Sequence, residues 1–179
     1  MVITLIIFFI LYFIDQLTKY LAQTFLTASN SAFIPHVMSF ELTYNTGAAF
    51  SSLDGAAWLL IIISTIATIV LIYYCLKNNW KTEKFKSFIL TMILAGCVGN
   101  LYDRIIQTIP SLNGSDGRRG VVDMIRFDFL DSICQALFKK DFAICNVADI
   151  YLVIGLILLA IYILFFADKR KGKNEVKSH

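Results

Sequence analysis

Two aspartates stand beside apolar segments and are the first candidates for chemistry. Asp149 lies near the start of a long apolar run, Val147 to Phe166, and Asp123 ends the stretch Gly-Val-Val-Asp at 120–123. An ionised side chain at the edge of a membrane-length apolar segment is costly and needs a structural or chemical reason. Two carboxylates that share one proton can turn water into a nucleophile at neutral pH. We therefore interpret Asp123 and Asp149 as a candidate catalytic pair.

Asp149 also has a purely structural interpretation. Asn146 is of a type preferred at helix N-caps, and an acidic residue three positions later can accept from the free amides of the first turn and complement its positive end. Taken alone, Asn146 and Asp149 favour such a cap. Other polar residues converge on the same membrane face, and this convergence favours a catalytic site.

Polar residues inside two other apolar segments belong to this convergence. Asp15 can form a structural ion pair with Lys19, four positions later on the same helical face, or support a site, and both interpretations stay open. Asn100 and Arg104 also share one helical face. Arg104 can bind a carboxylate or phosphate, or extend towards lipid headgroups. We include Asp15, Asn100 and Arg104 among the candidate site residues.

The segment from 27 to 55 predicts an ordered flap outside the membrane. Residues 39–44 alternate polar and apolar side chains, as in a half-buried strand. Asn45 and Gly47 follow, with two alanines behind them, and such small or flexible residues let another backbone approach. A peptide can bind there by strand addition, and an ordinary turn before a helix fits these residues equally well.

The composition excludes a water-soluble globule. Of the 179 residues, 58% are hydrophobic and 16% charged, against about 25% charged in soluble domains, and the mean hydropathy is +0.69. We predict an all-α membrane protein with one domain, residues 1–179, four transmembrane helices, a small extracytoplasmic β flap and an interfacial amphipathic helix. The predicted spans are residues 2–26, 56–76, 88–106 and 147–166.

The distribution of basic residues predicts the orientation in the membrane. Nine of the sixteen Lys and Arg residues lie in two clusters, four in Lys77–Lys86 and five between Lys169 and Lys177. By the positive-inside rule, the loop at 77–87, the tail at 167–179 and both termini are cytoplasmic. The loops at 27–55 and 107–146 are then outside, and the candidate site lies at the outer face. Nothing in the sequence suggests binding of nucleic acid.

The outer loop at 107–146 contains a predicted amphipathic helix, Arg126 to Phe138. Its apolar positions recur at helical spacing, and its opposite face is polar. The apolar stripe is Phe127, Leu130, Cys134 and Leu137, and the polar face carries Asp128, Asp131 and Gln135. Such a helix can lie on the membrane or bury its stripe in a partner protein.

The cysteines do not predict a metal site. They stand at positions 75, 97, 134 and 145 without a Cys-x-x-Cys spacing, and the sequence has two histidines. We expect no metal and no cofactor. Cys134 and Cys145 share the predicted outer side, where a disulfide is chemically permitted, although spacing alone does not decide it.

Five ordered blocks of the chain resemble one family. They are Asp15-Gln-Leu-Thr-Lys19, Asn45-Thr-Gly-Ala-Ala-Phe50, Gly99-Asn-Leu-Tyr-Asp-Arg104, Val121-Val-Asp123 and Asn146-Val-Ala-Asp149. Together they resemble bacterial lipoprotein signal peptidase, the type II signal peptidase, and the resemblance extends from Asp15 to about Phe165. Two features depart from it: Cys145 stands where an aromatic residue is usual, and the segments at 107–119 and 128–144 are longer than is typical.

The resemblance implies an aspartyl endopeptidase of the bacterial cell membrane that needs no metal or cofactor. It implies cleavage of signal peptides from prolipoproteins, just before a Cys that carries diacylglycerol, contact with membrane lipids, and inhibition by the cyclic peptide globomycin. Asp123 and Asp149 match the catalytic pair of the family. The positions that match residues shaping the site are Asp15, Asn45, Gly47, Asn100, Arg104 and Asn146.

Two other classes of function would explain part of this pattern. A small transporter or proton-coupled channel subunit would explain Asp15 and Arg104, but its ionisable residues should be spread through the depth of the membrane. A thiol enzyme using Cys145 and His36 would need two separate loops to meet, and it leaves the aspartates unexplained.

Overall fold

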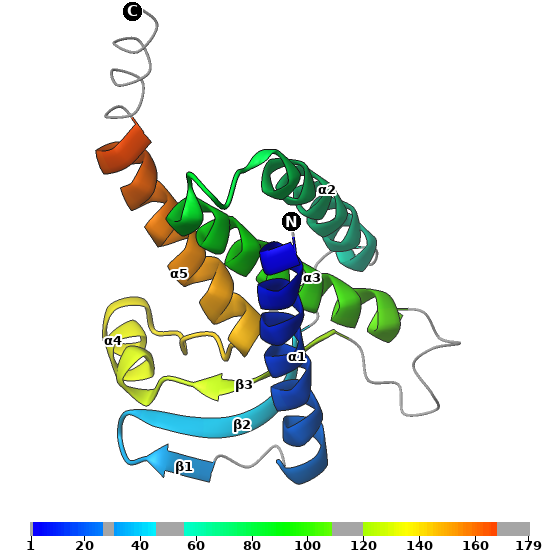
Figure 1. Cartoon of the computed structure of the whole chain (residues 1–179). Helices are drawn as coiled ribbons and strands as arrows, with labels where there is room; N and C mark the ends of the chain where they lie inside the picture. Colours follow the sequence, from blue (N-terminus) through cyan, green and yellow to red (C-terminus); the bar gives the residue numbers. More distant parts are fainter. Residues whose placement is uncertain (1, 27–30, 46–55, 109–119, 168–179) are drawn as a thin grey trace, which may run out of the picture.

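The computed structural model describes residues 2–26, 31–45, 56–108 and 120–167 (Figure 1). Short strands and one short helix are inserted between the membrane-length helices. In chain order they are α1 (Val2–Phe25), β1 (Ser31–Ile34), β2 (Met38–Asn45), α2 (Ala56–Lys77), α3 (Lys84–Thr108), β3 (Val121–Arg126), α4 (Asp128–Phe138), α5 (Val147–Tyr162) and the π-helical turn η3 (Ile163–Ala167).

Among the described residues four helices are long and apolar enough to cross a membrane, which confirms the predicted fold class: α1, α2, α3, and α5 together with η3. The central one is α3, because it packs against the other three and buries residues such as Ile89 and Ala95 completely. The others turn apolar side chains outwards: Phe13 of α1, Ile66 of α2 and Leu156 of α5 are each more than half exposed. Such a surface suits lipid and not water, so this is a multi-pass membrane protein.

Small residues let α3 approach its neighbours closely. A Cβ atom at Gly96 would lie 2.6 Å from the carbonyl oxygen of Ala148 on α5, and one at Gly99 would lie 2.5 Å from Oδ2 of Asp15 on α1. Both distances are shorter than carbon tolerates. The two glycines therefore permit a tight helix contact, which brings α1 and α5 together on one stretch of α3.

The two ends of the helix bundle differ. At one end Trp80, between α2 and α3, donates to Thr4 of α1, and Tyr162 of α5 donates to Glu83. At the other end lie the sheet and α4 (Figure 1). The start of α1, the connection from α2 to α3 and the end of α5 thus share the end opposite the sheet.

A three-stranded antiparallel sheet in the order β1-β2-β3 closes that other end. β2 contains the strand predicted at 39–44, whereas β1 and β3 were not predicted. β3 is buried from Val121 to Ile125, and its other edge pairs with the backbone of Cys145, which exchanges hydrogen bonds of 2.8 and 2.9 Å with Ile125. Because both edges are occupied, β3 holds its side chains in fixed positions.

α4 matches the predicted amphipathic helix from Asp128 onwards, whereas Arg126, the predicted first residue, belongs to β3. Part of the polar face of α4 turns towards the protein. Asp131 is buried because it accepts from the guanidinium of Arg126 and from the backbone N–H of Phe142. On the other side of the helix, Phe129 and Ile133 are exposed. Cys134 and Cys145, at the two ends of this region, are free thiols.

We predict that Gly99→Ala lowers the free energy of unfolding by about 1–3 kcal/mol, because the added methyl group has no room beside Asp15 and Ala148. Thermal unfolding in detergent measures this. Ala160→Val, which adds carbon to an exposed position of α5, is the control and should change the unfolding temperature little. Equal effects of the two substitutions would contradict the packing argument.

Candidate active site

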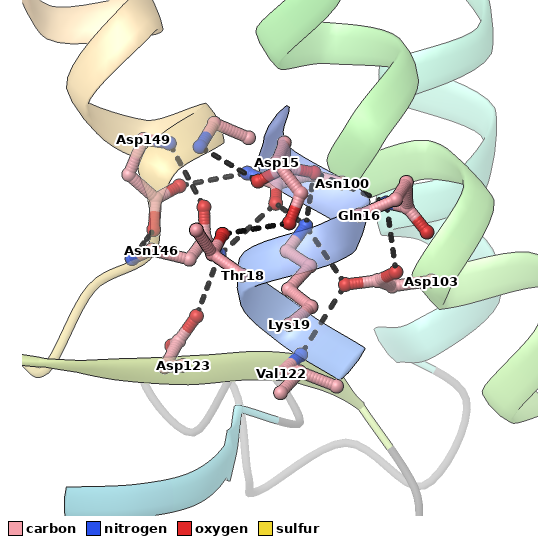
Figure 2. A network of polar contacts seen from close by, with 11 residues as sticks. Asp15, Gln16, Thr18, Lys19, Asn100, Asp103, Val122, Asp123, Asn146 and Asp149 are labelled. Carbon is pink, nitrogen blue, oxygen red and sulfur yellow. Dashed lines mark hydrogen bonds and ion pairs between the residues drawn. The ribbon is translucent and has the colours of Figure 1, made fainter. Parts of the chain in front are cut away.

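Asp123 and Asp149 reach one polar network from two different elements (Figure 2). Asp123 lies in the middle of β3 and is 1% exposed, and Asp149 lies in the first turn of α5. Asn146 joins them. Its Nδ2 donates to Asp123 Oδ1 at 2.7 Å, and its Oδ1 accepts from the backbone N–H of Asp149 at 2.9 Å. One buried amide therefore relates the strand to the helix.

The residues that cap α5 also take part in the candidate pair. Asn146 is the N-cap of α5, and Asp149 Oδ2 accepts from the backbone N–H of Asn146 at 3.1 Å, which completes a capping box. The other oxygen, Asp149 Oδ1, accepts from Asn100 Nδ2 at 2.7 Å. The structural alternative is thus present in the fold, and it leaves one carboxylate oxygen directed at the site.

Asn100 connects this pair to α1. Its Oδ1 accepts from Asn146 Nδ2 at 3.1 Å and from Lys19 Nζ at 3.2 Å. Both asparagines are buried, and in each the oxygen faces donors and the nitrogen faces acceptors. Buried amides are stable only when both of their ends are satisfied in this way.

Asp15 forms the predicted pair with Lys19, at 2.9 Å, and also supports α5. Asp15 Oδ1 accepts from the backbone N–H of Ala148 at 2.9 Å. This N–H belongs to the first turn of α5, where amides have no partner within the helix. Both interpretations of Asp15 are therefore compatible: one oxygen pairs with the ammonium group, and the other holds the start of α5.

Lys19 and Asp103 belong to the same cluster, although the sequence analysis did not include them among the site residues. Lys19 Nζ lies 2.9 Å from Asp103 Oδ2, and Asp103 accepts from the backbone N–H of Val122 at 3.3 Å. Val122 directly precedes Asp123. The sequence spacing could have identified Asp103, because it follows Asn100 by three positions and shares its helical face.

The remaining predicted residues have different surroundings. Asn45, the last residue of β2, hydrogen-bonds through its side chain to Asp123. Arg104 turns towards α2, where its guanidinium donates to Ser64 Oγ at 3.2 Å. Gly47 lies outside the described residues. Within the described ranges, no three His, Cys, Asp or Glu side chains are grouped as metal ligands.

Comparison with known proteins places this chain in a family. The family described as "Signal peptidase (SPase) II" matches residues 7–165. The chain belongs to the signal peptidase II family. It is 36% identical over 164 residues to a lipoprotein signal peptidase of Enterococcus faecalis. The matched residues make up 90% of this chain and 88% of that protein. A lipoprotein signal peptidase of Lactobacillus johnsonii is 32% identical over 156 residues, 87% of each chain.

Solved structures agree with this membership. A bacterial membrane enzyme determined in meso at 1.9 Å resolution superposes with a TM-score of 0.74 and 29% identity, covering 93% of this chain and 96% of the other. A second one, at 2.3 Å resolution, has a TM-score of 0.69 and 30% identity, with 92% and 88% covered. The protein is thus a peptidase, and therefore a hydrolase, of the signal peptidase II type.

The peptidase keeps Asp123 in surroundings that disfavour its ionised form. Burial is the main cause, and the nearby carboxylate of Asp149 adds to it, so that the pKa of Asp123 is raised to about 7. The side-chain amides of Asn45 and Asn146 and the charge of Lys19 oppose this increase. A carboxyl group with such a pKa can hold or release a proton near neutral pH.

The thiol of Cys145 is affected in the same direction. Burial, followed by the charges of Asp149 and Asp123, raises the pKa of Cys145 to about 12. At neutral pH the group is therefore a thiol and not the nucleophilic thiolate. This argues against the alternative of a thiol enzyme that uses Cys145.

The raised pKa of Asp123 predicts a pH-dependent stability. Between about pH 4 and about pH 7 the folded protein holds a proton that the unfolded chain has lost, so wild-type stability falls as the pH rises through this window. Asp123→Asn abolishes this loss. As the pH rises from 5 to 8, the free energy of unfolding of the variant should therefore increase relative to that of wild type by on the order of a few kcal/mol.

Thermal unfolding of both proteins in detergent across this pH range measures the difference. Asp141→Asn, at an exposed carboxylate, is the control and should keep a nearly constant offset from wild type. If the stability difference between Asp123→Asn and wild type is also the same at every pH, Asp123 does not carry the extra proton.

Proposed function

We propose that this peptidase removes signal peptides from diacylglyceryl-modified prolipoproteins, cleaving before the lipidated Cys, with Asp123 and Asp149 as its catalytic pair. The observation that carries the proposal is the pair itself, a buried Asp123 and a half-buried Asp149, joined through Asn146 and held where β3, α3 and α5 meet. Membership of the signal peptidase II family and the names of the relatives supply the substrate class.

The proposed reaction needs one aspartate ionised and the other protonated. The carboxylate takes a proton from water while the water oxygen bonds to the scissile carbonyl carbon, and the protonated partner gives its proton to the carbonyl oxygen. Breakdown of this intermediate breaks the C–N bond, and a proton passes to the leaving nitrogen. Asp123 suits such a cycle, because its pKa lies near neutral pH and its buried Oδ2 has no hydrogen-bond partner within the described ranges.

The other predicted residues hold this pair in the proposed mechanism. Asn100 and Asn146 donate to the two carboxylates, and Asn45 contacts Asp123 from β2. Asp15 fixes the start of α5 through Ala148. Arg104, and Gly47 outside the described residues, remain proposed as residues that shape the substrate path.

An apolar groove beside the pair supports a lipid-bearing substrate. It lies between α1, the sheet and the start of α5, and Met124 and Val147 in its lining are each within two positions of a proposed catalytic aspartate. Ala22 and Phe40 are also part of the lining. Such a surface accepts an acyl chain because it has few polar groups to desolvate. We infer that lipid of the substrate lies here, and that globomycin competes for the same site.

The orientation of the protein follows from its charge distribution. The basic segment 77–86 lies with the start of α1 and the end of α5 at the end of the bundle opposite the sheet, and this basic end is proposed to be cytoplasmic. The pair then faces the outer side of a bacterial cell membrane. A transporter is not favoured, since the chain belongs to a peptidase family and Asp15, Lys19 and Asp103 join one network with the pair.

The first prediction of the proposal concerns the pair. Asp123→Asn and Asp149→Asn should each reduce cleavage of a lipidated precursor by several powers of ten, and the double variant should be hardly slower than either, because the two act as a unit. Asn can replace Asp as a helix cap, so a purely structural Asp149 would tolerate the change.

Purified variants are assayed by gel shift in detergent, with Asp141→Asn as the control and globomycin binding as the check of the folded site. Substantial turnover by either single Asn variant would rule out the aspartyl mechanism.

A further prediction concerns orientation. A reporter Cys placed between positions 78 and 84 should be protected from a membrane-impermeant thiol reagent added outside, because this basic loop is cytoplasmic. The experiment uses intact cells and a variant lacking the four native cysteines, with labelling after lysis as the control. Labelling from outside would reverse the orientation and the proposed location of the site.

A further inference from the structure

The orientation of the Asn100 amide is determined by its partners. An ammonium group can only donate, so the atom that faces Lys19 at 3.2 Å must be the amide oxygen. Asn146 Nδ2 donates to the same oxygen at 3.1 Å. The nitrogen of Asn100 is then directed at Asp149 Oδ1, to which it donates at 2.7 Å. A buried positive charge thus stands one amide away from the aspartate pair (Figure 2).

The ammonium group of Lys19 is itself fully engaged. It is 3% exposed, and its three N–H groups have three acceptors: Asp15 and Asp103 at 2.9 Å each, and the Asn100 oxygen. A group with every donor used cannot turn to another partner without losing a buried interaction. The position of Lys19 therefore sets the position of the Asn100 amide. Its charge also polarises that amide and strengthens the N–H donated to Asp149.

The two aspartates receive unequal support. Asp149 accepts one N–H on each oxygen, from Asn100 and from the backbone of Asn146. Asp123 hydrogen-bonds with the side chains of Asn146, at Oδ1, and of Asn45, whereas its buried Oδ2 has no partner within the described part of the chain. A carboxylate that accepts on both oxygens is stabilised as an anion, and an unpartnered buried oxygen suits a protonated acid.

We propose that Lys19 is a positioning residue for this pair: by holding the Asn100 amide, it assigns Asp149 the role of the carboxylate that accepts a proton from water and Asp123 the role of the acid. This inference rests on the proposed function. In the reaction, the proton of water passes to Asp149 as the water oxygen bonds to the carbonyl carbon, and the proton of Asp123 passes to the carbonyl oxygen. Asp103 shares the task, because it holds both Lys19 and the backbone of β3 beside Asp123.

The charges around the pair make the proposal testable by pH. Among the residues that the structure describes, the charged and titratable groups around it are Lys19 with its two partners, Asp15 from α1 and Asp103 from α3, and the thiol of Cys145 before α5. Asp103→Asn removes a negative charge and keeps an acceptor for the N–H of Val122. The pair should then lose its protons more readily, and both limbs of the plot of kcat against pH should move to lower pH, by on the order of half a pH unit or more.

The second variant combines Lys19→Met with Asp103→Asn, which keeps the net charge of the cluster. Relative to Asp103→Asn alone, both limbs should move back to higher pH because the ammonium charge is gone. Without the fixed Asn100 amide, kcat should fall roughly 100-fold with little change in KM. Lys86→Met, which removes an ammonium group paired with Glu83 at 3.4 Å, far along α3, is the matched control and should change neither kcat nor the limbs.

Opposite shifts of the limbs in the two variants would support the proposal, because a merely structural role changes the amount of active enzyme and not its pH profile. Unmoved limbs in Asp103→Asn would overturn it, even if the double variant does not fold. The proposed function fails separately, if Asp123→Asn or Asp149→Asn remains active. If those variants are inactive while the limbs stay in place, the pair is catalytic and the role of Lys19 is refuted.

Discussion

A single buried ammonium group holds the polar centre of this membrane protein together. Lys19 of α1 has its three acceptors on α1 and α3, and Asp103 extends the contact to the backbone of β3. Removing a charge from water is costly, and the cost is offset only when all partners are present and well oriented. Loss of one partner of such a buried pair costs about 3–5 kcal/mol. The cluster therefore forms as a whole, and α1, α3 and β3 are fixed together.

The same atoms serve folding and the proposed chemistry. Asn146 and Asp149 cap α5, and their remaining polar atoms contact Asp123 and Asn100. A cap alone would be satisfied at the surface, where water is available for the unused oxygen. Here the cap is placed against α3, because Gly96 and Gly99 leave room for Ala148 and Asp15. Close packing of the helices thus converts an ordinary helix start into a candidate active site.

The apolar exterior of the protein strengthens the electrostatic interactions within the polar network. Side chains exposed on α1, α2 and α5 face lipid, so the network lies within surroundings of low polarity, where electrostatic interactions are strong. Asp123 shows the consequence, since burial is the main reason that its pKa rises to about 7. Peptide hydrolysis by a carboxyl pair needs such a shift, because at the ordinary pKa of aspartate both members would be ionised at neutral pH.

The sequence by itself determined the features that depend on neighbours along the chain. Apolar runs of membrane length predicted the four spans, and helical spacing predicted the Asp15–Lys19 pair and α4. The spacing of Asn146 and Asp149 predicted the cap. Only the tertiary structure decided which side chains meet across long separations. It paired β3 with β2, brought Asp103 to Lys19, turned Arg104 towards Ser64 and buried Asp131. The physical reason is that local spacing fixes a helical face, whereas the partner of that face depends on packing of the whole chain, which no short pattern specifies.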